Sequence, residues 1–86
     1  MIRAYTGQKA MNSIASIIVP ERVGRQFLRL YNASSPVFIG SASVTTLIGY
    51  RIDAGVDIAL PFVEEAVYGR CAGTDLSTVS FIDEAP

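Results

Sequence analysis

Apolar and polar residues alternate over short segments of this chain, and Gly, Pro, Asn, Asp and Ser separate the segments. Such alternation is typical of β-strands that bury one face. The pattern predicts strands over residues 14–19, 25–32, 37–39, 47–52, 56–60, 66–71 and 77–82. We therefore expect an all-β protein, either a compact antiparallel β-sandwich or a jelly-roll-like barrel of six to seven short strands.

The predicted strands also indicate which side chains form the core. Residues two apart in a strand point to the same face, so one apolar set in each strand should face inward. This alternation places the following residues in the interior: Leu28, Leu30, Ile39, Ile58, Leu60, Val67, Val79 and Phe81. Val56 belongs to the same inward set, and Asp57 should face outward.

The turn residues predict how the chain is organised. Residues 33–36 follow one strand and precede another, which is the pattern of a tight hairpin, and the Asn32 side chain should stabilise the turn before Pro36. Gly49 indicates a bulge or a close backbone approach. Before the first regular pattern, residues 1–24 are interpreted as an N-terminal arm with a candidate strand, and residues 25–86 as the β-sandwich domain.

Composition adds an expectation of self-association. The chain has 86 residues, of which 50% are hydrophobic and 17% charged, and its β-branched residues are nine Ile, eight Val and five Thr. A domain of this size buries only about 63% of the surface of its unfolded chain. The apolar content therefore exceeds what one small core can hide, and we expect a homo-oligomer or docking on a partner.

Residue counts exclude several kinds of chemistry. The chain has no His and one Cys, so a triad with a His base, a Cys/His zinc site and an intrachain disulfide are ruled out. Adjacent acidic residues in a strand point to opposite faces and cannot act together as acid and base. We expect no enzyme activity, no catalytic residues, no cofactor and no metal.

Nucleic acid and membranes are also unfavoured as partners. A net charge of −1 argues against an electrostatic nucleic-acid binder. The best apolar run, residues 14–19, is far shorter than the roughly 20 residues that span a bilayer, and it ends at Pro20. We therefore expect neither nucleic acid nor membrane as a partner.

One stripe of side chains is a candidate interface. Arg25, Phe27, Arg29 and Tyr31 share one face of a predicted strand, and Arg and aromatic residues are enriched where proteins meet. Two alternatives stay open. The aromatic rings could pack under loops beside solvated arginines, or they could stack on single-stranded nucleic acid.

The order of motifs resembles a known group of proteins. The motifs are LYNAS (30–34), VFIG (37–40), SVTT (43–46), Gly49, IDAG (52–55), IAL (58–60), VYG (67–69) and AGT (72–74). Over residues 25–82 this pattern resembles small β-sandwich virion proteins of tailed bacteriophages, of the capsid decoration or head and tail accessory type. The resemblance carries no active-site residues.

The resemblance implies a phage structural protein. We expect a capsid decoration protein that oligomerises, preferably as a trimer, binds the major capsid protein on the outside of the virion and stabilises the assembled head. It would pass through the host cytoplasm during assembly. Residues 1–19, with Ile14, Ile17 and Ile18, would reach the shell or a neighbouring subunit by strand addition. The alternative is a receptor- or carbohydrate-binding accessory module of a head or tail fibre.

Overall fold

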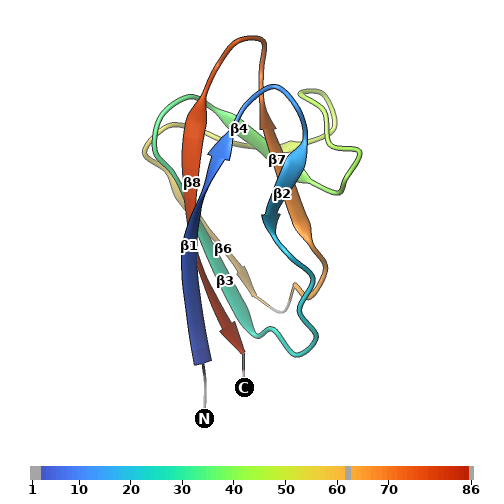
Figure 1. Ribbon diagram of the computed structural model, residues 1–86, viewed down its shortest axis with the longest axis vertical. Helices are drawn as coiled ribbons and strands as arrows, with labels where there is room; N and C mark the ends of the chain where they lie inside the picture. Colours follow the sequence, from blue (N-terminus) through green and yellow to red (C-terminus); the bar gives the residue numbers. More distant parts are fainter. Residues whose placement is uncertain (1–2, 62, 86) are drawn as a thin grey trace.

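The computed structural model describes residues 3–61 and 63–85, and this part of the chain contains strands and no helix (Figure 1). The start of the predicted arm, residues 1 and 2, lies outside the described residues. The strands are β1 (Arg3–Met11), β2 (Ser16–Val19), β3 (Phe27–Asn32), β4 (Val37–Gly40), β5 (Tyr50–Ile52), β6 (Asp57–Pro61), β7 (Val67–Cys71) and β8 (Ser77–Ala85).

The strands form two four-stranded antiparallel sheets. Sheet A has the order β1-β8-β3-β6, and sheet B has the order β2-β7-β4-β5. The pairs β1·β8, β2·β7, β3·β6 and β4·β5 are nested, as in one long hairpin folded over on itself. This nesting is the strand order of a jelly roll. The predicted antiparallel sandwich is therefore confirmed, with eight strands among the described residues rather than six or seven.

The N-terminal arm is a correction. β1 pairs with β8 along its whole length, from Arg3 opposite Ala85 to Met11 opposite Ser77, and β2 pairs with β7. Figure 1 shows β1 lying beside β8. Most β1 side chains are exposed, so the strand lacks the apolar alternation that marks a half-buried strand. The described part of residues 1–24 thus contributes strands to the sandwich.

The predicted hairpin over residues 33–36 is wrong, because β3 and β4 belong to different sheets. The segment between β3 and β4 crosses from sheet A to sheet B, and the side chain of Asn32 holds it in place. This side chain is buried, and its Nδ2 donates to the carbonyls of Ser35 and Ile52, each at 2.8 Å. The Ser77 hydroxyl donates to its Oδ1. The expectation that Asn32 stabilises the turn before Pro36 is confirmed, but the turn joins two sheets.

The core lies between the two sheets. Five of the predicted interior residues are buried, namely Leu28, Leu30, Ile39, Val67 and Val79. The other three, Ile58, Leu60 and Phe81, are partly buried and pack against this core. Val56 is exposed, contrary to prediction, because it precedes β6 in the turn after Gly55, where φ is 76°.

The sandwich has two lateral sides where sheet edges face each other. One side is formed by the outermost strands β1 and β2, and the other by β6 and β5. Apolar surface between the sheets comes closest to solvent at these two sides. They therefore define the position of the surface features described next.

Candidate protein interface

The outer face of sheet A carries three residues of the predicted stripe. Phe27, Arg29 and Tyr31 alternate along β3 with the buried Leu28 and Leu30, so they point away from the core. Arg29 and Tyr31 are exposed and Phe27 is half-buried. The Arg29 guanidinium carbon lies 5.7 Å from the centre of the Phe27 ring. We call these three residues the β3 ridge.

The β3 ridge lies between both apolar and acidic residues, since Tyr31 is opposite Asp57 on β6 and Phe27 is opposite Glu84 on β8. Arg29 lies opposite Ala59 on β6 and Ile82 on β8, and Ile82 lies opposite Thr6 on β1. Arg29 Nη1 is 3.1 Å from Asp57 Oδ2, and both side chains are about half exposed. An exposed pair of this kind contributes little to stability, so the ridge is available for contact with another protein.

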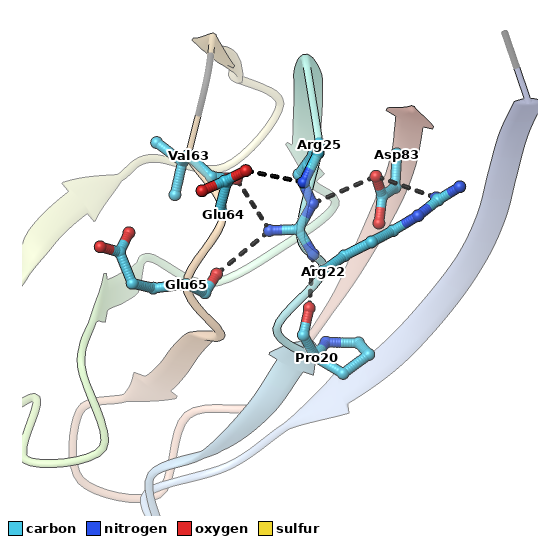
Figure 2. Close-up of polar contacts among 8 residues, drawn as sticks. Pro20, Arg22, Arg25, Val63, Glu64, Glu65 and Asp83 are labelled. Carbon is cyan, nitrogen blue, oxygen red and sulfur yellow. Dashed lines mark hydrogen bonds and ion pairs between the residues drawn. The ribbon is translucent and has the colours of Figure 1, made fainter. Parts of the chain in front are cut away.

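Arg25, the fourth residue of the predicted stripe, is a correction, because only 1% of it is exposed. Its guanidinium Nη1 donates to the carbonyls of Val63 and Glu65, each at 3.1 Å. Nη2 donates to the Pro20 carbonyl, and Nε lies 3.1 Å from Asp83 Oδ1. Figure 2 shows the guanidinium surrounded by these groups. Arg25 therefore cannot face a partner.

The backbone before β3 explains why Arg25 is inside. Strand β3 begins only at Phe27, so the alternation of the strand does not extend to Arg25. Gly24 has φ 84°, and its N–H donates to Glu64 Oε2 at 2.6 Å. The Arg22 N–H donates to the Glu64 carbonyl at 2.9 Å. These bonds hold the β2–β3 loop against the β6–β7 connector and turn Arg25 inward.

We call Arg22, Arg25 and Asp83 the arginine cluster, whose contacts join the β2–β3 loop, the β6–β7 connector, β8 and β1. Asp83 Oδ1 on β8 contacts Arg25 Nε and also Arg22 Nη1, the latter at 3.2 Å. The Arg22 guanidinium carbon lies 4.0 Å from the centre of the Tyr5 ring on β1. A buried charge is stable only when it is paired and hydrogen-bonded, and Arg25 is both, through Asp83 and three backbone carbonyls. Its role is to close one end of the sandwich.

The isoleucines of the predicted interface do not form one surface. Ile18 is buried in the core beside Gly69, where a Cβ on the glycine would lie 2.7 Å from Ile18 Cδ1. Ile17 is half-buried on sheet B, opposite Tyr68. Ile14 is 71% exposed in the β1–β2 loop. The assignment of Ile18 to an interface is therefore wrong, and Ile14 and Ile17 lie away from the β3 ridge.

A surface that the sequence did not reveal is the loop of residues 41–49 between β4 and β5. Leu47 is 93% exposed and Ile48 is 78% exposed at its tip, and Figure 1 shows the loop projecting from the sandwich. The strand predicted over residues 47–52 begins only at Tyr50. Large apolar side chains in this position gain nothing from the core of their own chain.

The 41–49 loop is braced by contacts of its own residues. Val44 is buried beneath it, and Thr45 Oγ1 accepts hydrogen bonds from the N–H groups of Leu47 at 3.2 Å and Ile48 at 3.1 Å. A Cβ on Gly49 would lie 2.7 Å from Phe38 Cβ. The close approach predicted for Gly49 is confirmed, and it was the one sequence signal that pointed to this loop.

Each lateral side of the sandwich has a hollow. On the side of β5 and β6, a groove of about 610 Å³ is lined mainly by apolar residues from β4, β6 and β7, with Tyr50 and Glu65 also in its wall. On the side of β1 and β2, a smaller hollow of about 260 Å³ includes Tyr5, Arg22 and Asp83 in its wall. The larger volume falls in the range of pockets that bind small molecules.

The described residues offer little reactive chemistry. They contain no group of three or more His, Cys, Asp or Glu side chains placed to hold a metal ion. Two of the acidic side chains form ion pairs, Asp53 with Arg51 and Asp57 with Arg29. Burial raises the pKa of the Cys71 thiol, and the nearby Asp75 carboxylate raises it further. That the protein is not an enzyme stays a prediction.

A membrane-spanning helix is not found among the described residues.

Comparisons with known proteins support the fold alone. No protein family matches the chain, and no curated protein does. A solved structure from Bacillus, described as endospore appendages that form a novel family of disulfide-linked pili, has a TM-score of 0.59 at 11% identity, over 99% of this chain and 86% of that chain. A likeness at this identity shows a shared β-sandwich architecture and does not transfer a function.

Proposed function

We propose that this protein is a structural subunit of a virion, a capsid decoration protein that forms a small homo-oligomer, preferably a trimer, and binds the major capsid protein on the outside of the assembled head. The observation that carries this proposal is the hydrogen-bonded 41–49 loop with its exposed Leu47 and Ile48. The β3 ridge supports it as a second surface suited to protein contact.

The loop suits docking because it is already ordered before a partner binds. Burying an exposed Leu or Ile side chain contributes about 1.5–3 kcal/mol. A flexible loop would lose part of that gain in conformational entropy, whereas the Thr45 and Gly49 contacts have already ordered this one. Leu47 and Ile48 can therefore act as apolar anchors in a pocket of the shell.

The mechanism of such a protein is mass action. A ligand that binds the assembled shell and not its separated subunits stabilises the shell by RT ln(1 + [L]/Kd) at each site. At a free concentration of about 100 times Kd this amounts to about 2.7 kcal/mol per site. Because this stabilisation is repeated at many sites, a small domain without enzymatic activity can strengthen a large assembly.

The test is cosedimentation with empty shells of the source phage. Wild-type protein should pellet with the shells and raise the temperature at which they break. The Leu47→Ser/Ile48→Ser variant should bind at least about 100-fold more weakly, because two buried apolar anchors are lost. Val23→Ser is the matched control, because Val23 is 85% exposed on a different loop. If the wild-type protein neither pellets with the shells nor stabilises them, capsid decoration is wrong.

Truncation of the N-terminus would not test this proposal. Removing residues 1–19 deletes β1 and β2 together with the buried Met11, Ile18 and Val19. The remaining chain would lose part of its core and unfold. Substitutions at exposed positions keep the fold and are the sharper experiment.

A receptor- or carbohydrate-binding accessory module is the second candidate. The observation that favours it is the exposure of Tyr50, which lies at the end of the 41–49 loop and lines the lateral groove. Aromatic rings at the edge of a groove are suited to stacking on sugars. Binding of the wild-type protein to a glycan array, lost in Tyr50→Ala and kept in Tyr31→Ala, would support this function.

A further inference from the structure

Each lateral side of the sandwich exposes the free edge of one strand of sheet A. β1 and β6 are the outermost strands of sheet A, and among the described strands β1 pairs only with β8 and β6 only with β3. Both strands therefore have a free edge, at opposite ends of the same sheet. An unpaired strand edge is a template for pairing unless its side chains restrict the partner.

The β1 side presents an aromatic ring and a lysine on one face. Tyr5 lies opposite Asp83 and Lys9 opposite Val79, and both of these β8 residues are buried, so Tyr5 and Lys9 are on the inner face of their strand. Lys9 is exposed and Tyr5 is 50% exposed beside Arg22. Four residues apart in a strand, they are about 13 Å from each other.

The β5/β6 side presents an apolar groove with one carboxylate, that of Glu65, in its wall. Glu65 lines the groove of about 610 Å³. It contacts Arg25 through its backbone carbonyl, and Figure 2 shows its carboxylate pointing away from the guanidinium. Among residues 3–61 and 63–85, the Glu65 carboxylate takes part in no ion pair. It is exposed and available to a cation from outside the molecule.

We propose that the β1 side of one copy docks on the β5/β6 side of a second copy, with Tyr5 over the groove and Lys9 beside Glu65. The charges decide the pairing. Two β1 sides would bring Lys9 against Lys9, and two β5/β6 sides would bring Glu65 against Glu65, whereas the mixed contact joins opposite charges. This inference rests on the homo-oligomer of the proposed function and names its interface.

A contact between two different sides of the molecule is heterologous. It forms a closed ring if the rotation between subunits returns to the start, and an open filament if it does not. A ring of three agrees with the expected trimer. Symmetric dimers, which need the same patch on both subunits, are not built by this contact.

A charge exchange between the two sides tests the contact. Self-association of wild-type protein, Lys9→Glu, Glu65→Lys and the double variant is measured by sedimentation velocity over a concentration series. Each single variant should raise the dissociation constant about three- to tenfold, because a weak attraction becomes a repulsion. The double variant restores opposite charges and should return to within about twofold of wild type. Asp75→Lys is the control with the same charge change as Glu65→Lys, on an exposed loop away from the groove.

The outcomes separate this interface from the proposed function. If wild-type protein associates and none of the charge variants changes its association, the interface is wrong and the oligomeric subunit stands. If both single variants weaken association and the double variant is no better, Lys9 and Glu65 do not meet, and the interface is wrong. A wild-type monomer at every concentration overturns both proposals. Unchanged far-UV circular dichroism confirms that the variants fold.

Discussion

Charged residues usually lie on the surface of a protein and large apolar residues in its core. The arginine cluster and the 41–49 loop are exceptions of opposite kinds. The cluster places the charged Arg25 inside, where it is 1% exposed, and the loop places the apolar Leu47 outside, where it is 93% exposed. Both regions are well supplied with hydrogen bonds. Arg25 donates to three backbone carbonyls, and Thr45 accepts from two backbone N–H groups.

The two regions differ in what their side chains contact. The Arg25 guanidinium is buried and contacts three backbone carbonyls and Asp83, so removing it is expected to destabilise the fold. The apolar ends of Leu47 and Ile48 project into solvent, so their removal should leave the fold unchanged. Buried charge indicates a structural role here, and exposed apolar surface on an ordered loop indicates a binding role. The following predictions test this contrast.

The largest effect is expected for Arg25→Met. The substitution keeps an apolar stem but leaves the carbonyls of Val63, Glu65 and Pro20 without their donor and Asp83 with a weaker set of partners. Breaking a buried charge pair costs about 3–5 kcal/mol. Urea unfolding should show this loss, while Arg29→Met, at the exposed pair with Asp57, should cost less than about 1 kcal/mol. Equal losses in the two variants would contradict the structural role of Arg25.

Gly49→Ala should have the next largest effect. Its new Cβ would lie 2.7 Å from Phe38 Cβ and 2.9 Å from the Thr45 carbonyl oxygen, and neither atom is the end of a flexible side chain. Overpacking of this kind costs about 1–3 kcal/mol. The free energy of unfolding should fall by that amount, whereas Ala42→Ser, at an exposed position of the same loop, should leave it unchanged.

Thr45→Val should loosen the loop with a smaller effect on the whole domain. The variant removes the oxygen that accepts from the N–H groups of Leu47 and Ile48. The free energy of unfolding should fall by about 0.5–1.5 kcal/mol. Amide hydrogen exchange should become faster at residue 47 in Thr45→Val, and less so at residue 48, whose N–H also donates to the Thr45 carbonyl at 3.3 Å. Exchange should stay slow in Thr45→Ser, which retains the hydroxyl. Exchange that is equally slow in both variants would show that the hydroxyl does not order the loop.

Cys71 provides a buried ionisable group without a cationic partner, in contrast to Arg25. Burial and then Asp75 raise the pKa of its thiol above the ordinary value of 9.0. The folded protein therefore holds the proton more tightly than the unfolded chain. The resulting stability is complete below pH 9.0 and is lost as the pH rises through the folded pKa. Chemical unfolding between pH 8 and 10 should show a decline that is smaller in Cys71→Ala.

The smallest effect on stability is expected for Leu47→Ser and Ile48→Ser. These side chains contact solvent over most of their surface, so each change should alter the free energy of unfolding by less than about 0.5 kcal/mol. Melting curves that match wild type, combined with lost binding to shells, would place both residues in a binding surface. A loss of more than about 1 kcal/mol would instead indicate that the loop tip packs on its own domain.

Local sequence determined most of the strands and most of the core. Leu28 and Leu30 alternate with Arg29 and Tyr31, and this period of two is enough to predict both the strand and its buried face. The same reasoning located the ridge residues of β3 correctly. It missed β1, because an edge strand with exposed side chains on both faces has no need of apolar alternation.

Only the tertiary structure decided the partition of strands between sheets and the roles of Arg25 and Glu65. Residues 33–36 fit a hairpin as well as a crossing between sheets, and the choice depends on Asn32 bonds to Ile52 and Ser77, 20 and 45 residues away. Arg25 is buried because Val63, Glu65 and Asp83 surround it, each from about 40 to 60 positions later in the chain. The alternation of apolar and polar residues in the sequence shows which side of a strand is apolar. The partners of a buried polar group come from distant segments that only the fold brings together.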